Sequence, residues 1–443
     1  MKNERSDMKK KNLTFTVLSA IGIILILLGH LDLNVLSFGG LFPYYSYHVM
    51  IFVFISGYFY KPEDEDHTVR FIVRKALRLL LPYFIWNVIY GLIAIPMRSS
   101  GFIFAGEFNL YNLLVAPFMG GHQFGLNAAA WFVPALFLLQ ICDMAARKIA
   151  SVPVKIIGKR TDKASSYETL LKDGDDQKNE KHDTTVIYGT AAEWIFMIMY
   201  LATGVAAVWL SQRGSVYDAY RLPARLMLMA PAFQCGRLYK TRLEKYDITP
   251  WFLYFPLLFG MNLLLTYVHG GLAYSTVWVT GFAGTALTPF ITSLTGIALW
   301  LRVSKIIAML IGKRKADRPS SSDSPSRNDS PSSSGSGVTT KGKISASSFA
   351  YKIFDLTGTH TYDIMMHHLA VFMLIKAVFA LIAGYGGMLA DFDSAAFKED
   401  LYYTYVPGGV QVLKLVYLVL GLMIPVMIGI LTDKVKNHIR NRG

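Results

Sequence analysis

Charged residues are scarce in this sequence. They make up 17% of its 443 residues, whereas soluble proteins carry about 25%, which indicates that much of the surface faces lipid. Hydrophobic residues account for 53%, and the mean hydropathy is +0.36. Several apolar runs reach the roughly 20 residues that a helix needs to cross a hydrocarbon layer, and the short alternating segments typical of a membrane β-barrel are absent. We therefore predict an all-α, polytopic membrane protein.

Cysteine is scarcer still. The chain has two, Cys142 and Cys235, which lie far apart within or beside apolar runs. The sequence therefore predicts neither a disulfide framework nor a cysteine-based metal site. Positive charge is plentiful, with a net charge of +14. Because the basic residues gather in alternate loops, this excess follows membrane topology and does not indicate a nucleic-acid partner.

The apolar runs predict about ten spans. They cover residues 13–30, 44–60, 77–97, 128–146, 187–210, 222–238, 250–268, 285–310, 361–384 and 408–431. The alternation of basic and charge-poor loops places both termini in the cytoplasm, and no small-residue cleavage site follows the first run, so we expect it to be retained. The apolar segment 110–127 is expected to be re-entrant or a packed external loop, and 274–284 is expected to be an interfacial piece.

Two long polar loops interrupt the spans at about 150–185 and 312–348. The first is highly charged and lacks an apolar period, and the second is rich in serine, proline and glycine. Neither composition can bury a core, so we expect both to be disordered cytoplasmic loops. We treat residues 1–443 as a single membrane domain that contains these loops.

A histidine ends the first apolar run, in the stretch "IGIILILLGHLDLN". An ionisable side chain at the mouth of a span is costly and is therefore a functional candidate, although the helix could simply end at Gly29 and leave His30 in the interface. Asp32 follows closely enough to orient the imidazole, and a histidine beside a carboxylate is the minimum for a general base acting on a hydroxyl. His48 opens the second run near the same membrane face and is a further candidate.

Three arginines, Arg70, Arg74 and Arg78, recur every four residues in "VRFIVRKALR". This spacing places them along one helical face. Basic residues at the cytoplasmic end of a span can be a simple topological anchor, or they can clamp a phosphate group, whose geometry matches guanidinium. The pattern leaves both alternatives open.

Histidines also gather at the start of the ninth run, in "GTHTYDIMMHHLAVF". His360, Asp363 and His367 are spaced i, i+3 and i+7, so one helical face can carry all three, and His368 adjoins them. No cysteine or matched carboxylate cluster joins this set, and the spacing is not that of a zinc-protease motif. We therefore expect no metal at these residues.

Five pieces of the sequence, taken together, resemble a known family. They are "AIGIILILLGH", "FVFISGYFY", "FIVRKALRLLLPYFIW", "WFVPALFLLQI" and "YDIMMHHLAVF". Their order and their spread over nearly the whole chain are similar to the integral-membrane acyltransferase-3 family, the membrane O-acyltransferases of bacterial surface polysaccharides. The resemblance is greatest to the subgroup that acetylates cell-surface sugars.

The resemblance implies a fold of ten helices around a polar channel, which acyl-CoA enters from the cytoplasm. It also assigns roles to residues of this chain. The essential histidine at the end of the first span matches His30, and the basic run associated with acyl-CoA matches Arg74, Lys75 and Arg78. The late histidine of the family matches His367 or His368, because the doubled histidine leaves the register ambiguous.

One position departs from the family pattern. The family usually has an arginine or lysine eleven residues before the first-span histidine and an acid a little earlier, whereas this chain has Ser19 there and no acid near Thr16. The missing charge pair leaves open an altered coupling to the donor, a different donor or a loss of activity. It bears on catalysis and not on the fold.

The sequence and the resemblance together predict a membrane O-acetyltransferase of the bacterial inner membrane. It is expected to move an acyl group, acetyl in particular, from acyl-CoA to a hydroxyl of a cell-surface or lipid-linked sugar, without a metal. His30 is the expected general base, Asp32 orients it, and His48 or His367 supports the acceptor or the oxyanion. Two alternatives stay open: a glycan transporter or flippase, and a catalytically inactive membrane scaffold.

Overall fold

The structure is a computed structural model that describes residues 12–61, 67–121, 123–168, 177–212, 218–316, 346–385 and 389–440. Within these ranges the chain is helical and forms no β-strand beyond an isolated bridge between Ser275 and Thr280. Eight of the described helices are long and apolar enough to cross a membrane. The prediction of an all-α, polytopic membrane protein is confirmed.

The main helices have the following bounds. They are α1 (Leu13–His30), α2 (Tyr44–Tyr58), α3 (Thr68–Lys75), α4 (Leu81–Ser99), α5 (Phe132–Glu168), α6 (Gln177–Gln212), α7 (Asp218–Leu238), α8 (Trp251–His269), α9 (Thr288–Ala316), α10 (Ala346–Thr359), α11 (Thr361–Gly384), α12 (Ser394–Glu399) and α13 (Lys414–Arg440). A π-helical turn joins α3 to α4, so that both belong to one candidate span of 32 residues.

Two of the ten expected spans, α2 and α7, are not among the eight long apolar helices. α2 has 15 residues, which at about 1.5 Å per residue is shorter than a hydrocarbon layer about 30 Å thick. α7 is long enough, at 21 residues, but charged residues such as Arg221, Arg225 and Arg237 make it only weakly apolar. Both helices lie inside the assembly, where neighbouring helices rather than lipid surround them.

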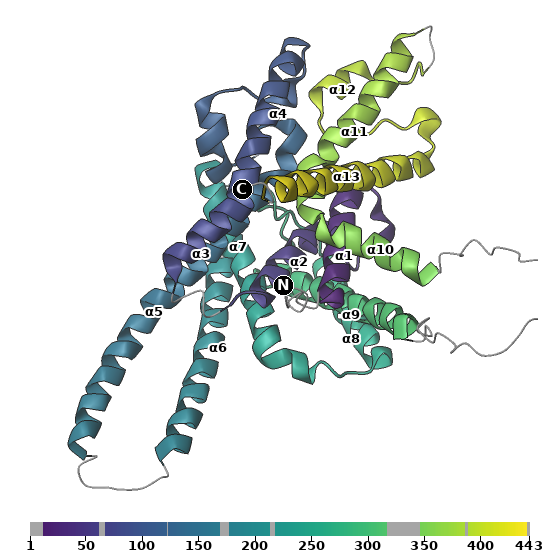
Figure 1. The fold of residues 1–443 in the computed structure, drawn as a ribbon. Helices are drawn as coiled ribbons and strands as arrows, with labels where there is room; N and C mark the ends of the chain where they lie inside the picture. The colour runs from purple at the N-terminus through teal and green to yellow at the C-terminus, as the bar shows by residue number, and fades with distance from the viewer. Residues whose placement is uncertain are drawn as a thin grey trace, which may run out of the picture.

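α1 and α2 lie at the centre of the helix assembly (Figure 1). α1 packs against α2, α9, α10 and α11. Its residues are apolar on all sides, and most are buried, as expected of a helix that is enclosed by others. α8 is equally apolar, but Asn262 is its one buried residue, so its surface suits contact with lipid.

Glycines allow α2 and α7 to cross closely. A Cβ atom added at Gly57 would lie 1.9 Å from the backbone oxygen of Phe233, and one added at Gly236 would lie 2.1 Å from the backbone oxygen of Phe54. Small residues that let backbones approach are the usual basis of helix packing in membranes. Gly57 and Gly236 are therefore positions where the backbones of α2 and α7 come into direct contact.

We expect Gly57→Ala to destabilise the protein by about 1–3 kcal/mol or more, because the new methyl group meets backbone that cannot rotate away. The apparent melting temperature in detergent measures the effect. Gly260→Ala is the matched control, since a Cβ at this glycine of α8 meets nothing within 4 Å. An equal melting temperature for the two variants would contradict the close crossing.

One buried arginine forms hydrogen bonds to both of the apolar segments that were not expected to cross the membrane. Arg225 of α7 donates from Nε to the oxygen of Val277 at 2.7 Å and from Nη1 to the oxygen of Gly120 at 2.8 Å. Its guanidinium also lies 4.3 Å from the ring centroid of Trp131. The described residues of the segments 110–127 and 274–284 are thus held against α7.

The polar loop at about 150–185 is helical in its described parts. α5 continues to Glu168 and α6 begins at Gln177, and both helices project from the assembly (Figure 1). A helix already nucleated in a span can extend through residues with good helix propensity. Residues 169–176 and most of the second loop, 317–345, lie outside the described residues.

Candidate active site around His30

α1 begins and ends at identifiable positions. Asn12 caps its first turn, with Oδ1 accepting the backbone N–H of Phe15 at 3.4 Å. At the other end, Asp32 adopts a left-handed backbone conformation with φ of 49°, which a helix cannot continue through. His30 is therefore the last residue of α1, and the turn after it directs the chain towards α2.

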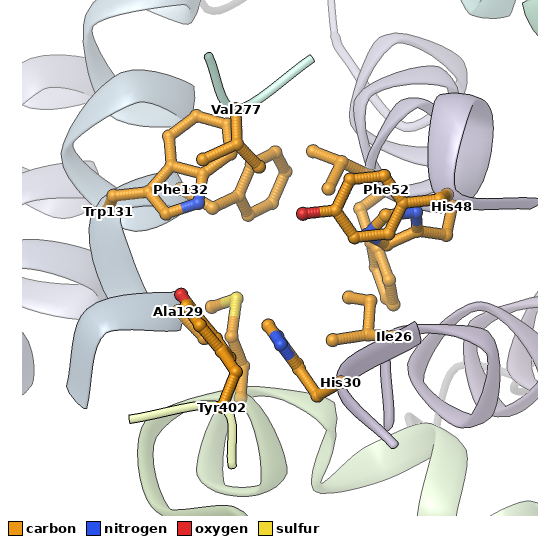
Figure 2. A pocket seen from close by; sticks show the side chains of 12 residues that line it. Ile26, His30, His48, Phe52, Ala129, Trp131, Phe132, Val277 and Tyr402 are labelled. Atoms are coloured by element: carbon orange, nitrogen blue, oxygen red, sulfur yellow. The ribbon is translucent and has the colours of Figure 1, made fainter. Parts of the chain in front are cut away.

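The His30 imidazole packs against two other rings, those of His368 and Tyr402, and Figure 2 shows Tyr402 beside it. Its centroid is 5.1 Å from that of His368 in α11 and 5.4 Å from that of Tyr402, whose ring is nearly parallel at 4°. Tyr402 belongs to the connection between α12 and α13. Burial raises the pKa of Tyr402 to about 12, so its phenol stays a neutral hydrogen-bond donor at physiological pH.

A cavity of about 380 Å³ opens beside His30, and we name it the Asp32 cavity. It is lined by Gly29, His30, Asp32, Asn34, Tyr44, Tyr45 and Tyr402. Aromatic rings, a carboxylate and an amide therefore share its wall. Its volume lies in the range of about 300–1,000 Å³ that is usual for small-molecule sites.

A second, smaller space also borders His30, and we name it the His48 pocket (Figure 2). It is lined by Ile26, His30, Tyr45, His48, Val49, Phe52, Ala129, Trp131, Phe132, Val277, Met365 and Tyr402. Its volume of about 30 Å³ leaves room for little more than one or two water molecules. His30, Tyr45 and Tyr402 line both spaces, so His30 stands at their junction.

Hydrogen bonds assign the tautomers of two further histidines. Nδ1 of His48 lies 2.8 Å from the oxygen of Tyr44, and Nδ1 of His368 lies 2.7 Å from the oxygen of Ile364. A carbonyl oxygen accepts only, so each Nδ1 carries the proton, and Nε2 of each neutral ring is an acceptor. Nε2 of His368 is buried without a hydrogen-bond partner among the described residues.

The adjacent His367 points elsewhere. Its Nδ1 lies 2.7 Å from the hydroxyl of Tyr90, and its ring centroid lies 4.2 Å from that of Trp86, both in α4. Successive residues of a helix are about 100° apart around its axis, so the two adjacent histidines contact different neighbours. In this structure His368, not His367, packs against His30.

Asp32 shares the cavity with His30, but its carboxylate Oδ1 accepts a hydrogen bond of 3.1 Å from the side chain of Asn34. Its expected role in orienting His30 stays a prediction. His360 contacts Asp363 at 3.2 Å, away from the contacts of His367. No group of three potential metal ligands occurs within the part of the chain that the structure describes.

The basic residues predicted to bind the donor lie on α3 and the π-helical turn. Arg70, Arg74 and Arg78 are exposed, and the charged groups of Arg74 and Lys75 lie 5.9 Å and 5.4 Å from the ring centroid of Phe71. None of these four basic residues lines the Asp32 cavity or the His48 pocket. These four residues, which we name the basic face, therefore lie outside both of the spaces that border His30.

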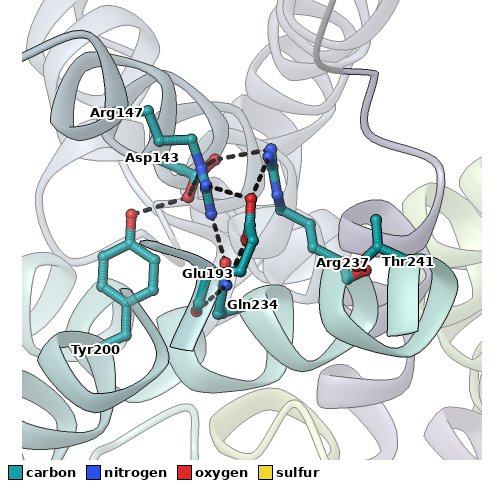
Figure 3. A network of polar contacts seen from close by, with 7 residues as sticks. All are labelled: Asp143, Arg147, Glu193, Tyr200, Gln234, Arg237 and Thr241. Carbon is teal, nitrogen blue, oxygen red and sulfur yellow. Dashed lines mark hydrogen bonds and ion pairs between the residues drawn. The ribbon is translucent and has the colours of Figure 1, made fainter. Parts of the chain in front are cut away.

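The structure also contains a buried network of charges that was not predicted from the sequence (Figure 3). It joins α5, α6 and α7 through Asp143, Arg147, Glu193, Tyr200, Gln234 and Arg237. Arg147 contacts Asp143 at 3.1 Å and Glu193 at 2.9 Å, and Arg237 contacts Glu193 at 3.2 Å. Ionisable residues inside expected spans were the signal that could have revealed it.

The family model described as an acyltransferase domain, of the acyltransferase-3 family, matches residues 13–157. This region contains α1 to α4 and the first part of α5, and therefore His30, His48 and the basic face. The histidines of α11 lie beyond it. Searches of curated proteins and of solved structures gave no significant match. The resemblance found in the sequence is confirmed over the matched residues.

Proposed function

Because this chain carries an acyltransferase-3 domain and is a membrane acyltransferase, we propose that it transfers an acetyl group from acetyl-CoA to a hydroxyl of a cell-surface or lipid-linked sugar. The observation that carries the proposal is the position of His30 at the junction of the Asp32 cavity and the His48 pocket. A base that borders both spaces can contact an acceptor in one of them and an acyl group in the other.

The proposed reaction begins with a sugar hydroxyl in the Asp32 cavity. The imidazole of His30 takes the hydroxyl proton while the oxygen attacks the thioester carbonyl carbon. The tetrahedral intermediate then collapses, the carbon–sulfur bond breaks, and the sulfur of coenzyme A leaves. The imidazolium returns the proton to that sulfur, which restores His30 and releases a thiol and an ester.

Both spaces suit these substrates. Tyrosine rings beside Asp32 and Asn34 offer apolar faces and polar groups to a sugar. The narrow, mostly apolar His48 pocket favours a short acyl group such as acetyl. Because Nε2 of neutral His48 is an acceptor, this histidine suits an acceptor hydroxyl or a water better than it suits a developing oxyanion, which needs donors.

The basic face of α3 is proposed to bind the phosphate groups of coenzyme A. We expect Arg74→Ala to raise KM for acetyl-CoA by about tenfold or more, since a hydrogen bond to a charged group contributes about 1.5–3 kcal/mol. We expect kcat to change little, because the phosphates are bound alike in the ground and transition states. Initial rates at varied acetyl-CoA measure both constants.

Arg98→Ala is the matched control for Arg74→Ala. Arg98 lies at the opposite end of the same continuous helix and pairs with Glu107 at 2.8 Å, so its loss should leave KM for acetyl-CoA unchanged. If both arginine variants raised KM equally, the effect would be one of general charge or folding, and the basic face would be only a topological anchor.

The inactive scaffold is the alternative with an observation in its favour. Ser19 stands where the family usually has a basic residue, and its hydroxyl donates to the oxygen of Phe15 at 2.8 Å within α1. That position therefore offers no cation to a donor. Acetyl transfer that depends on His30 distinguishes the proposed enzyme from this scaffold, and substrate movement without coenzyme A would favour a transporter. We also propose the bacterial inner membrane as its location, with cytoplasmic termini.

A further inference from the structure

A lysine is buried inside one of the membrane-spanning helices. Lys376 of α11 is 2% exposed, and its Nζ donates to the backbone oxygen of Leu401 at 2.8 Å. A cation inside a span is costly and is retained where it has a function. The residue after its partner is Tyr402, whose ring stacks on His30. Lys376 thus acts on the backbone next to the candidate active site.

The peptide group before Tyr402 is held at both of its polar atoms. Its oxygen, from Leu401, accepts the hydrogen bond of Lys376, and its N–H, from Tyr402, donates to Oδ1 of Asp400 at 2.8 Å. Hydrogen bonds to charged groups are shorter and stronger than neutral ones. A cation and a carboxylate therefore fix the peptide plane from which the Tyr402 ring projects.

A second anchor of this connection lies at Tyr405, three residues after Tyr402. The hydroxyl of Tyr417 in α13 donates to the backbone oxygen of Tyr405 at 2.9 Å, and the ring of Tyr405 packs on Phe379 of α11 at 5.3 Å. Residues 401–405, which we name the strap, are thus fastened to α11 at one end and to α11 and α13 at the other. Tyr402 lies between the two anchors.

We infer that Lys376 is a positioning residue: by holding the strap, it keeps Tyr402 on His30 and separates the His48 pocket from the Asp32 cavity. The inference rests on the proposed acyl transfer. Tyr402 and His30 line both spaces, so a displaced Tyr402 joins them and admits water to the acyl group. Water then attacks the thioester carbonyl in place of the sugar hydroxyl, and the products are a carboxylic acid and the free thiol.

The test measures how acyl groups divide between the two fates. Purified protein receives acetyl-labelled acetyl-CoA and the glycan fraction of the producing cell, and the label is counted in glycan and in free acetate. We expect Lys376→Met, which keeps the length of the side chain but not the donor, to lower transfer about tenfold to a hundredfold, as small misplacements do. The ratio of acetate to acetylated glycan should rise at least severalfold.

Lys398→Met is the matched control, because Lys398 is exposed on α12, close to the strap in sequence. It should leave both the rate and the ratio as in the wild type. A merely structural role of Lys376 would lower transfer and hydrolysis together and leave the ratio unchanged, and that result would overturn the inference. Asp400→Ala removes the carboxylate that accepts the Tyr402 N–H. It should also raise the ratio of acetate to acetylated glycan, and it provides a test if Lys376→Met does not fold.

A second measurement does not depend on activity. Ala129 lines the His48 pocket, so Ala129→Cys, in protein whose Cys142 and Cys235 are replaced, reports access to that pocket through alkylation by a maleimide in detergent. Lys376→Met should speed the alkylation severalfold, whereas equal rates would contradict the strap. Failure of the proposed function looks different: wild type would then transfer no acetyl group, whatever the alkylation rates.

Discussion

Replacing His30 with alanine is expected to lower the rate of acetyl transfer by about 10²–10⁴-fold, which is the usual contribution of a positioned general base. Of the residues in α1, His30 is the one that lines both the Asp32 cavity and the His48 pocket, and its side chain is ionisable. Alanine leaves both substrates bound, so the loss should fall on kcat. Initial rates with acetyl-CoA and the glycan acceptor measure it.

The two histidines of α11 provide the matched comparison for His30. His368 packs on the His30 ring at 5.1 Å between centroids, whereas His367 contacts Tyr90 and Trp86. We therefore expect His368→Ala to lower kcat more than His367→Ala does. Equal rates for wild type and His30→Ala would mean that His30 is only the end of a helix. A larger loss for His367→Ala than for His368→Ala would contradict the arrangement at α11.

The second large effect is expected at the buried charge network. Asp143→Ala should lower the free energy of unfolding by about 3–5 kcal/mol, the usual cost of removing one partner of a buried ion pair. Asp143 is 2% exposed and Arg147 and Arg237 are both 7% exposed, so the substitution leaves two buried cations with Glu193 as their remaining carboxylate in the network. Tyr200 also loses the oxygen to which its hydroxyl donates at 2.8 Å.

Glu107→Ala is the matched control for Asp143→Ala. Glu107 also pairs with an arginine, but both side chains are more than half exposed, and an exposed pair contributes about 0–1 kcal/mol. Denaturant unfolding in mixed micelles compares the two variants. A loss for Asp143→Ala as small as that for Glu107→Ala would show that the network does not stabilise the fold, and Asp143→Asn should fall between the wild type and Asp143→Ala.

The sequence predicted the parts of the fold that depend on local pattern. The long apolar runs correspond to the eight long helices, and the end of α1 at His30 follows from a run that stops where polar residues begin. The expected number of ten spans was less reliable for α2 and α7, because a short helix and a weakly apolar helix can be enclosed by other helices. Apolar composition does not distinguish burial in protein from contact with lipid.

Much of the candidate site depends on contacts between distant segments, which a pattern of residue types cannot supply. Tyr402 and Val277 come from irregular connections that pack beside His30 and His48. The choice between His367 and His368 depends on how α11 is rotated against α1, and the sequence left that register open. The charge network was missed because its members lie on three helices, although ionisable residues inside spans could have drawn attention to it.

The most direct test of the proposed acyl transfer is the fate of the acetyl group in the wild-type protein. Membranes that contain wild type or His30→Ala are given acetyl-labelled acetyl-CoA and the producing cell's own glycan fraction, and the label in glycan and the free thiol are both measured. We predict that wild type places label in the glycan as a base-labile ester, with one thiol released per ester, and that His30→Ala does not. Absence of label in a competent glycan fraction, or equal labelling by both proteins, would contradict it.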